Sequence, residues 1–321
     1  MADVGVAFDG RAPIAGIPEQ ARLAEAGGAT TLWIASHLFL RDPITTAALA
    51  LGATTRIKIA LMALSPYSMH PVLAAMAAAT LDEMYPGRVT LCLGVGAPAD
   101  LAAAGIPSPQ PLATLGEAID LSRALLAGEP IRHAGQIFQV ADRRLVNGAG
   151  RVPIVLAASG PRMLELAGRA ADGVLISAAT SPPFIRWCLD HVERGAAGRA
   201  VAKLALVYTS VAPHAADAHA KVRRKLGFVL RGAHHARNLA LAGTALDQAA
   251  LGAAYKAEDW PAVDRLIDDG VVRNHAASGT QAEVRAAFAA YRAIGLDEVI
   301  VGGADTPEDV RDALAALGEG P

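Results

Sequence analysis

Two residues with proton-transfer or positioning chemistry follow the first two short apolar runs of this sequence. Asp9 comes directly after the run at residues 4–8, and His37 comes shortly after the run at residues 31–35. An imidazole transfers protons near neutral pH, and a carboxylate positions or polarises a neighbouring group. We therefore expect His37 and Asp9 to be the catalytic candidates. The alternative for each is a hydrogen bond that merely anchors its loop.

Small residues follow two later apolar runs. Gly94 and Gly96 follow the fourth run, and Ser159, Gly160 and Pro161 follow the fifth, where an alanine- and leucine-rich stretch begins. Glycines let a backbone approach a flat ring or a phosphate. A Ser-Gly-Pro helix start offers free N–H groups and the positive end of the helix dipole to a phosphate. Plain capping of the helix by Ser159 explains that segment equally well.

The apolar runs alternate with helical stretches, which is typical of repeated βα units around a parallel sheet. The predicted strands are residues 4–8, 31–35, 57–64, 89–93, 154–158, 173–177, 204–212 and 298–301. The predicted helices are residues 18–27, 43–53, 71–86, 112–126, 161–171, 183–194 and 306–317, with a hairpin in residues 128–151. Eight such units indicate an α/β protein with the (β/α)₈ TIM-barrel fold.

The chain is long enough for one large domain, which we expect to span residues 1–321. Residues 214–270 look wholly helical, and we interpret about 213–280 as a helical insertion between strands seven and eight. The alternative fold, a doubly wound sheet, normally has a glycine-rich fingerprint after its first strand. Here the first turn reads Asp9-Gly10-Arg11, which does not match that fingerprint.

Composition excludes several classes of function. The 29 Lys and Arg residues nearly balance the 31 Asp and Glu residues and are dispersed, so we expect no nucleic-acid partner. Two cysteines, Cys92 and Cys188, suggest neither a disulfide framework nor a metal cluster. The first residues lack a secretory signal, and prolines interrupt the longest uncharged segment, residues 59–81. We therefore expect a cytoplasmic protein with no membrane segment and no metal.

Several other charged or ring-bearing residues have ordinary structural interpretations. His70 precedes Pro71 and is expected either to start a helix with its ring satisfied or to lie in a strained ligand-binding turn. His234 and His235 read as a surface pair, and Asn274-His275 as loop residues that could reach the barrel mouth. Residues 223–225, Arg-Arg-Lys, read as a solvated helix face.

A set of motifs spread over nearly the whole chain resembles the luciferase-like flavin-dependent oxidoreductases. The most similar branch uses the deazaflavin F420 and is typified by methylenetetrahydromethanopterin reductase. The motifs lie at residues 69–71, 79–83, 86–88, 93–96, 157–162, 167–175, 181–182, 279–280 and 295–299. The motifs identify the superfamily without specifying a substrate.

The resemblance implies a cofactor site. It implies a cis peptide in a bulge after the third strand, at Met62–Ala63, which backs the cofactor ring. It also implies that His37 lies beside the ring and that the helix start after the fifth strand holds the cofactor phosphate. The cofactor-binding residues expected on this basis are Met62, Ala63, Gly94, Gly96, Ser159, Gly160 and Pro161.

The expected activity is F420-dependent hydride transfer to or from a small organic substrate, with the helical insertion as a lid and a homodimer as the assembly. One alternative is an FMN-dependent monooxygenase that uses reduced flavin, dioxygen and a reductase partner. The other is a non-catalytic flavin-binding paralogue. Ser36 and Ala97 stand where family members carry acids, which argues against a sugar-phosphate dehydrogenase. No strand end offers the lysine base of an aldolase.

Overall fold

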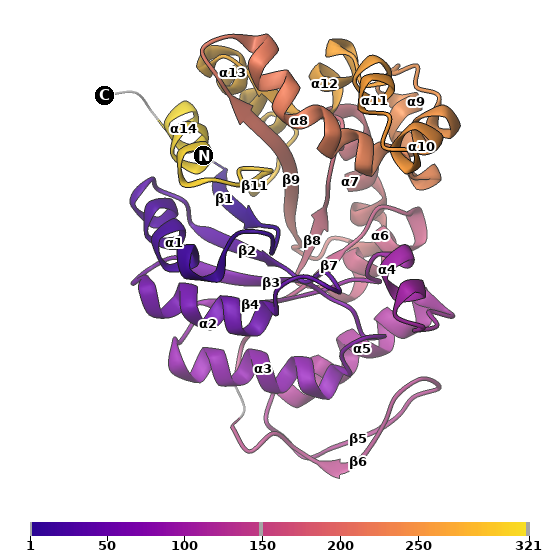
Figure 1. The fold of residues 1–321 in the computed structure, drawn as a ribbon. Helices are drawn as coiled ribbons and strands as arrows, with labels where there is room; N and C mark the ends of the chain where they lie inside the picture. Colours follow the sequence, from indigo (N-terminus) through magenta and orange to yellow (C-terminus); the bar gives the residue numbers. More distant parts are fainter. Residues whose placement is uncertain (1, 148–149, 319–321) are drawn as a thin grey trace.

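The computed structural model describes residues 2–147 and 150–318, in which parallel strands close into a barrel surrounded by helices (Figure 1). The barrel strands are β1 (Asp3–Phe8), β2 (Thr31–Ala35), β3 (Lys58–Leu64), β4 (Val89–Leu93), β7 (Ile154–Ala157), β8 (Gly173–Ile176), β9 (Ala202–Val211) and β11 (Glu298–Gly302). Their order is β9-β11-β1-β2-β3-β4-β7-β8, and pairing of β8 with β9 closes the ring. The predicted TIM barrel is confirmed, with each strand end within two residues of its predicted position.

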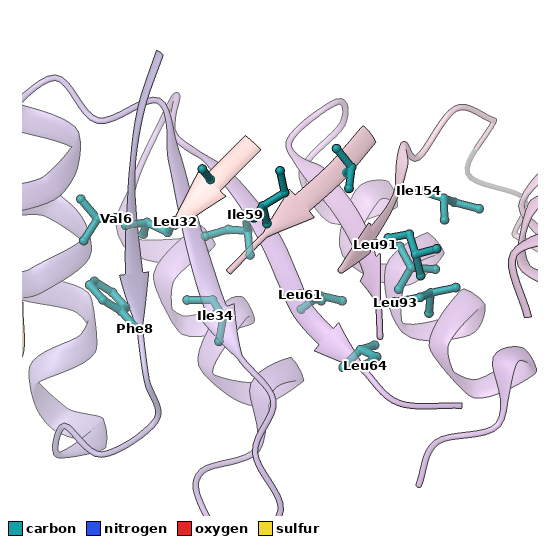
Figure 2. Close-up of a cluster of buried hydrophobic side chains, with 14 of the residues drawn as sticks. Val6, Phe8, Leu32, Ile34, Ile59, Leu61, Leu64, Leu91, Leu93 and Ile154 are labelled. Atoms are coloured by element: carbon teal, nitrogen blue, oxygen red, sulfur yellow. The ribbon is translucent and has the colours of Figure 1, made fainter. Parts of the chain in front are cut away.

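Alternate side chains of each strand face opposite sides, and both sides are apolar because helices cover the outside of the barrel. The inward cluster takes at least one residue from every barrel strand: Ala7, Trp33, Ala60, Cys92, Val155, Leu175, Leu204, Leu206 and Ile300. The outward side chains belong to the larger core between strands and helices. Figure 2 shows part of that core, including Val6, Leu32, Ile59, Leu91 and Ile154.

Helices connect the strands around the ring. They are α1 (Ile17–Ala26), α2 (Pro43–Ala53), α3 (Pro71–Met84), α4 (Pro98–Ala103), α5 (Pro111–Leu126), α6 (Pro161–Ala170), α7 (Pro182–Ala196), α13 (Gln281–Arg292) and α14 (Pro307–Leu317). Most start on a proline, whose fixed φ suits the first helical turn. This punctuation explains why the helix starts could be predicted from the sequence.

Between β9 and β11 the chain forms further helices. They are α8 (Ala215–Leu230), the short η2 (Ala233–His235), α9 (Ala236–Leu241), α10 (Gln248–Lys256), α11 (Trp260–Leu266) and α12 (Asp269–His275), grouped at the upper right of Figure 1. The prediction of one wholly helical stretch over residues 214–270 is therefore wrong in detail. Asp247, Asp259 and Asp268 each accept a backbone N–H as an N-cap and so begin a new helix. The short strand β10 (Ala277–Gly279), which pairs with β9, was not predicted from the sequence.

The predicted hairpin is present as the antiparallel pair β5 (Ile131–Ala134) and β6 (Gln139–Arg143). Glu117 of α5 accepts hydrogen bonds from three backbone N–H groups of its turn, at residues 136–138, and ties the hairpin to the ring. Residues 148–149 of the predicted hairpin segment lie outside the described residues. Among the helices described, none is long and apolar enough to cross a bilayer.

Candidate active site

The carboxyl ends of neighbouring barrel strands bring the predicted site residues to one rim. These residues are Asp9 after β1, His37 after β2, Met62 and Ala63 in β3, Gly94 and Gly96 after β4, and Ser159, Gly160 and Pro161 at and after the end of β7. The strands β1-β2-β3-β4-β7 are consecutive in the barrel, so the residues follow one half of its mouth. In barrels of this kind that face carries the functional loops.

His37 lies in the loop after β2, and its loop is fixed to the next strand. The side chain is exposed to solvent in the mouth, yet desolvation by the surrounding protein lowers its pKa below the ordinary value. The charges of Asp100 and Asp9 oppose that shift, and Arg11 adds to it. His37 is therefore a neutral imidazole at pH 7, able to accept a proton.

The backbone next to His37 contacts the predicted ring-backing peptide directly. The Ser36 N–H donates a 2.5 Å hydrogen bond to the Met62 carbonyl oxygen. The loop that presents the imidazole is thus held against the bulge of β3. This contact fixes the residue next to His37 to the bulge of β3, and the position of His37 beside the cofactor ring stays a prediction.

The Met62–Ala63 peptide is cis, so the peptide geometry implied by the resemblance is present. The pairing of β3 with β4 shifts register between Leu61 and Leu64, which is the expected bulge. Met62 and Ala63 are half-buried and pack against the inward cluster of the barrel. They form part of the surface at the top of that cluster.

Asp9 is bound to its own loop as well as facing the mouth. Its Oδ1 accepts a 2.8 Å hydrogen bond from the Arg11 N–H, and its Oδ2 lies 3.2 Å from Arg11 Nε. These contacts match the loop-anchoring alternative considered for Asp9. The carboxylate also influences the pKa of His37, so a positioning role stays a prediction.

Gly94 and Gly96 serve close packing at the rim. A Cβ at Gly94 would lie 2.9 Å from the Cβ of Ala63 and 3.4 Å from that of Ala157. Gly96 has φ +89°, a left-handed conformation that glycine adopts freely. Ser65 Oγ donates a 2.7 Å hydrogen bond to the Val95 carbonyl and joins this loop to the loop after β3. The glycines therefore let the β4 loop pack tightly beside the cis peptide.

The start of α6 is open. Gly160, not Ser159, is the N-cap residue, and within the described residues no side chain caps this helix. The interpretation of Ser159 as a plain helix cap is therefore wrong. Pro161 occupies the first turn, as expected. Exposed Ser159 and Gly160 stand before first-turn N–H groups that can meet an anion.

Two residues near the mouth were not predicted from the sequence as site residues. Asp100 in α4 influences His37 more strongly than Asp9 does. It comes three residues after Ala97, the position where an acid had been expected. Tyr208 of β9 packs against both the inward cluster and the core of the helical segment, and burial raises its pKa to about 12, with Asp9 and Asp305 adding to the shift. Neither could have been found from a loop or strand-end position, because Asp100 lies within α4 and Tyr208 within β9.

The other histidines that the sequence analysis singled out, at positions 70, 234, 235 and 275, have mostly structural roles. His70 caps α3 by accepting the Val72 N–H at its Nδ1, so its interpretation at the helix start is confirmed. His235 is buried with its pKa lowered to about 3 by desolvation, so the interpretation of His234-His235 as a surface pair is wrong for one member. His275 is fully buried behind the mouth and contacts a loop.

The basic cluster on α8 is a solvated face only at Arg224, which is exposed, and not at Arg223 and Lys225. Arg223 donates to the Ile267 carbonyl and pairs with Asp269. Lys225 Nζ lies 2.7 Å from Asp305 Oδ2 and donates a 2.5 Å hydrogen bond to the Gly303 carbonyl. That prediction failed because α8 packs against α12 and the loop after β11, contacts that helix periodicity does not show.

A large open groove of the described surface lies outside the barrel. It measures about 930 Å³ and runs between α5 and α6, with Asp120, Arg162 and Arg169 among its lining residues. None of the predicted site residues lines it. We place the candidate active site at the mouth because the loop of His37, the bulge of β3 and the uncapped start of α6 lie at the carboxyl ends of consecutive strands there.

Comparison with known proteins identifies the family of this chain. Residues 2–298 match the family described as luciferase-like monooxygenase. A 5,10-methylenetetrahydromethanopterin reductase from Methanolobus tindarius is 31% identical over 307 residues, covering 93% of each chain.

Two solved structures share the fold. The coenzyme F420-dependent tetrahydromethanopterin reductase of Methanopyrus kandleri has a TM-score of 0.89 at 22% identity, covering 98% of this chain and 97% of its own. An F420-dependent secondary alcohol dehydrogenase with an F420–acetone adduct has a TM-score of 0.81 at 20% identity, covering 99% of each chain. The family match spans most of this sequence, and the chain therefore belongs to the luciferase-like monooxygenase family of oxidoreductases.

Proposed function

We propose that this protein is an F420-dependent oxidoreductase that transfers a hydride to or from a small organic substrate in the barrel mouth. The observation that carries the proposal is the hydrogen bond from the Ser36 N–H to the Met62 carbonyl oxygen, which holds the loop of His37 against the bulge of β3. A full-length relative at 31% identity is a methylenetetrahydromethanopterin reductase. Solved neighbours that share the fold use F420.

The residues of the mouth fit a flavin-type cofactor. The half-buried apolar surface of Met62 and Ala63 suits one face of a flat ring. The open N-terminus of α6, with Ser159 and Gly160 before it, suits the phosphate of the cofactor tail. When bound, the deazaflavin supplies or accepts the hydride, which no side chain can do.

The side chains of the mouth manage the proton. Neutral His37 can accept a proton from a substrate hydroxyl at its free ring nitrogen, or hydrogen-bond a carbonyl oxygen once protonated. Asp100 and Asp9 stabilise the protonated imidazole by their charge. Tyr208 stays a neutral phenol at physiological pH and can donate a hydrogen bond to a substrate oxygen.

Titration of the apo-protein with F420 and, separately, with FMN tests the proposal, followed by tryptophan fluorescence and equilibrium dialysis. We expect saturable one-to-one binding of F420 and weaker binding of FMN. Turnover of simple alcohols, carbonyls and imines with bound F420 then tests the reaction. If the protein binds neither cofactor, the proposal is overturned.

The same experiment separates the alternatives. Tighter binding of FMN, with oxygen consumption in the presence of reduced FMN, identifies a monooxygenase. Binding without turnover of any acceptor, and without an effect of His37→Ala, identifies a non-catalytic paralogue.

We further propose that the chain is a single domain, acts in the cytoplasm and pairs with a second copy through α2 and α3. Large apolar side chains of these two consecutive ring helices are exposed: Leu49, Leu73, Met76 and Met84. Exposed apolar patches of this kind mark interfaces. Light scattering should give the molar mass of a dimer for the wild type and a lower mass, closer to that of a monomer, for Met76→Asp. A monomeric wild type would overturn the proposed pairing.

A further inference from the structure

The turn that follows β8 has an unusual backbone. Ala178 and Ala179 both have φ +53°, in the left-handed region that residues with a Cβ rarely adopt. Such a conformation is strained and persists only where the surroundings determine it. The residues that determine it here lie on helices far along the chain.

Asn238 of α9 holds the turn from one side. Its Nδ2 donates a 2.7 Å hydrogen bond to the Ala179 carbonyl oxygen. Its Oδ1 accepts hydrogen bonds of 3.0 Å from both the N–H and the hydroxyl of Ser181. The Asn238 side chain is fully buried, so these bonds are not exchanged with water. A single amide therefore joins both ends of the strained segment.

His275 of α12 makes a second contact with the same carbonyl. Its Nδ1 lies 3.0 Å from the Ala179 oxygen, and because a carbonyl only accepts, this nitrogen carries the proton. Its Nε2 then accepts from the Thr244 hydroxyl at 2.9 Å, and that hydroxyl accepts from Asn274 Nδ2 at 2.9 Å. In this series of hydrogen bonds each nitrogen and oxygen thus acts as a donor or an acceptor in a way that agrees with a neutral imidazole at His275.

The other side of the turn faces the candidate active site. Ala178 packs against the inward cluster of the barrel, as Met62, Ala63 and Ala157 also do. Ala179 packs instead against the core of the helical segment. Tyr291 of α13 donates a 2.9 Å hydrogen bond to the Thr180 carbonyl. The turn is therefore held between the helical segment and the inward cluster of the barrel.

We infer that Asn238 and His275 are positioning residues that fix the turn at residues 178–181 as a wall of the cofactor-ring pocket. The inference rests on the proposed function for the identity of the ligand, a flavin-type ring. It also changes the expected role of the helical segment. Moving this segment away from β8 would break the buried hydrogen bonds to Ala179 and Ser181 and leave buried polar groups without partners. The segment is a fixed wall here, not a hinged lid.

Asn238→Asp tests the inference with almost no change of volume when it is measured at alkaline pH, where the new carboxyl group is ionised, because a carboxylate cannot donate to the Ala179 carbonyl whereas a protonated carboxyl group can. Thr244→Val is the milder second variant, since it removes the hydroxyl that supports His275. The control is Val263→Ala, which loosens the same helical core at a fully buried position of α11 without touching the turn. Any general loss of stability appears in the control as well.

Two readouts decide the result. In apo-protein, hydrogen exchange at the backbone N–H groups of Ala179, Thr180, Ser181 and Phe184 should rise at least tenfold in Asn238→Asp and less in Thr244→Val, and stay near wild type in Val263→Ala. The Kd for F420 should rise at least tenfold in Asn238→Asp and change less than twofold in Val263→Ala.

Unchanged exchange and Kd in folded Asn238→Asp, or equal changes in Val263→Ala, overturn the positioning role. If wild type binds neither F420 nor FMN, the proposed function and the ring-wall assignment fail together. The exchange result then still decides whether Asn238 fixes the turn.

Discussion

Trp33 donates a 2.9 Å hydrogen bond from its indole Nε1 to Oε1 of Glu298 inside the barrel. Both side chains are buried, and a Cβ at Gly5 of β1 would overlap the Glu298 carboxyl. Burial raises the pKa of Glu298 to about 7; the hydrogen bond from Trp33 opposes the shift and the charge of Asp3 adds to it. The interior of the barrel thus contains a carboxyl group that favours its protonated form.

The first prediction concerns stability and pH. The pKa of Glu298 rises from the ordinary 4.5 to about 7 on folding, so the folded state binds the proton more tightly. Its contribution to stability is complete below pH 4.5 and is lost as the pH rises through 7, a loss of about 3 kcal/mol. Urea unfolding at pH 5 to 8 should show this decline in wild type and a weaker one in Glu298→Gln. Exposed Glu129→Gln is the control, and equal slopes in all three proteins would contradict the prediction.

The second prediction concerns the rim glycines. Gly94→Ala should destabilise the fold by about 1–3 kcal/mol through overpacking against Ala63, and should weaken cofactor binding. Gly116→Ala in α5 is the matched control, because its new Cβ would meet only Leu166 Cδ1, at 3.9 Å. We expect that control to gain up to about 1 kcal/mol from helix propensity. Thermal unfolding and dialysis measure both effects, and a stable Gly94→Ala with full affinity would refute the packing argument.

The third prediction concerns His37. His37→Ala should lower kcat about 10²–10⁴-fold if the imidazole transfers the proton. Asp100→Asn should lower the pKa of His37 further, because the charge of Asp100 raises it in wild type. NMR titration of the imidazole and the acid limb of the pH–rate profile should both move to lower pH. Exposed Asp120→Asn on α5 should leave them in place, and an unmoved titration in Asp100→Asn would show that the two residues are not coupled.

The fourth prediction separates capping from anion binding at α6. Ser159 does not cap this helix, so Ser159→Ala should change the free energy of unfolding by less than about 0.5 kcal/mol while weakening the affinity for F420. Asp42 does cap α2, accepting the Thr45 N–H at 2.7 Å, and Asp42→Ala should cost about 1 kcal/mol without changing cofactor affinity. The reverse pattern would restore the capping interpretation of Ser159.

The barrel could be predicted from the sequence because the patterns that indicate its strands and helices each extend over only a few neighbouring residues. Buried parallel strands appear as short apolar runs, and prolines such as Pro71 and Pro161 mark where helices start. The rim residues after these strands followed directly, since parallel strands all end at the same face. The cis peptide at Met62–Ala63 followed from the family resemblance rather than from local pattern.

The contacts between distant segments could not be predicted in this way. Asn238 meets Ala179 across 59 positions and His275 meets it across 96, and nothing in either neighbourhood indicates the partner. The influence of Asp100 on His37 likewise depends on how α4 folds over the mouth.

The sequence by itself therefore determined the strands, the helix starts and the rim to which His37, Met62 and Ser159 belong, because periodicity and capping act over a few residues. Tertiary structure alone decided that Gly160 rather than Ser159 occupies the N-cap position of α6, where no side chain caps the helix. It also decided that Glu298 lies beside Trp33 and that the helical segment is hydrogen-bonded to the turn after β8. These outcomes depend on burial and on hydrogen bonds between elements, whose geometry exists only once the barrel has closed.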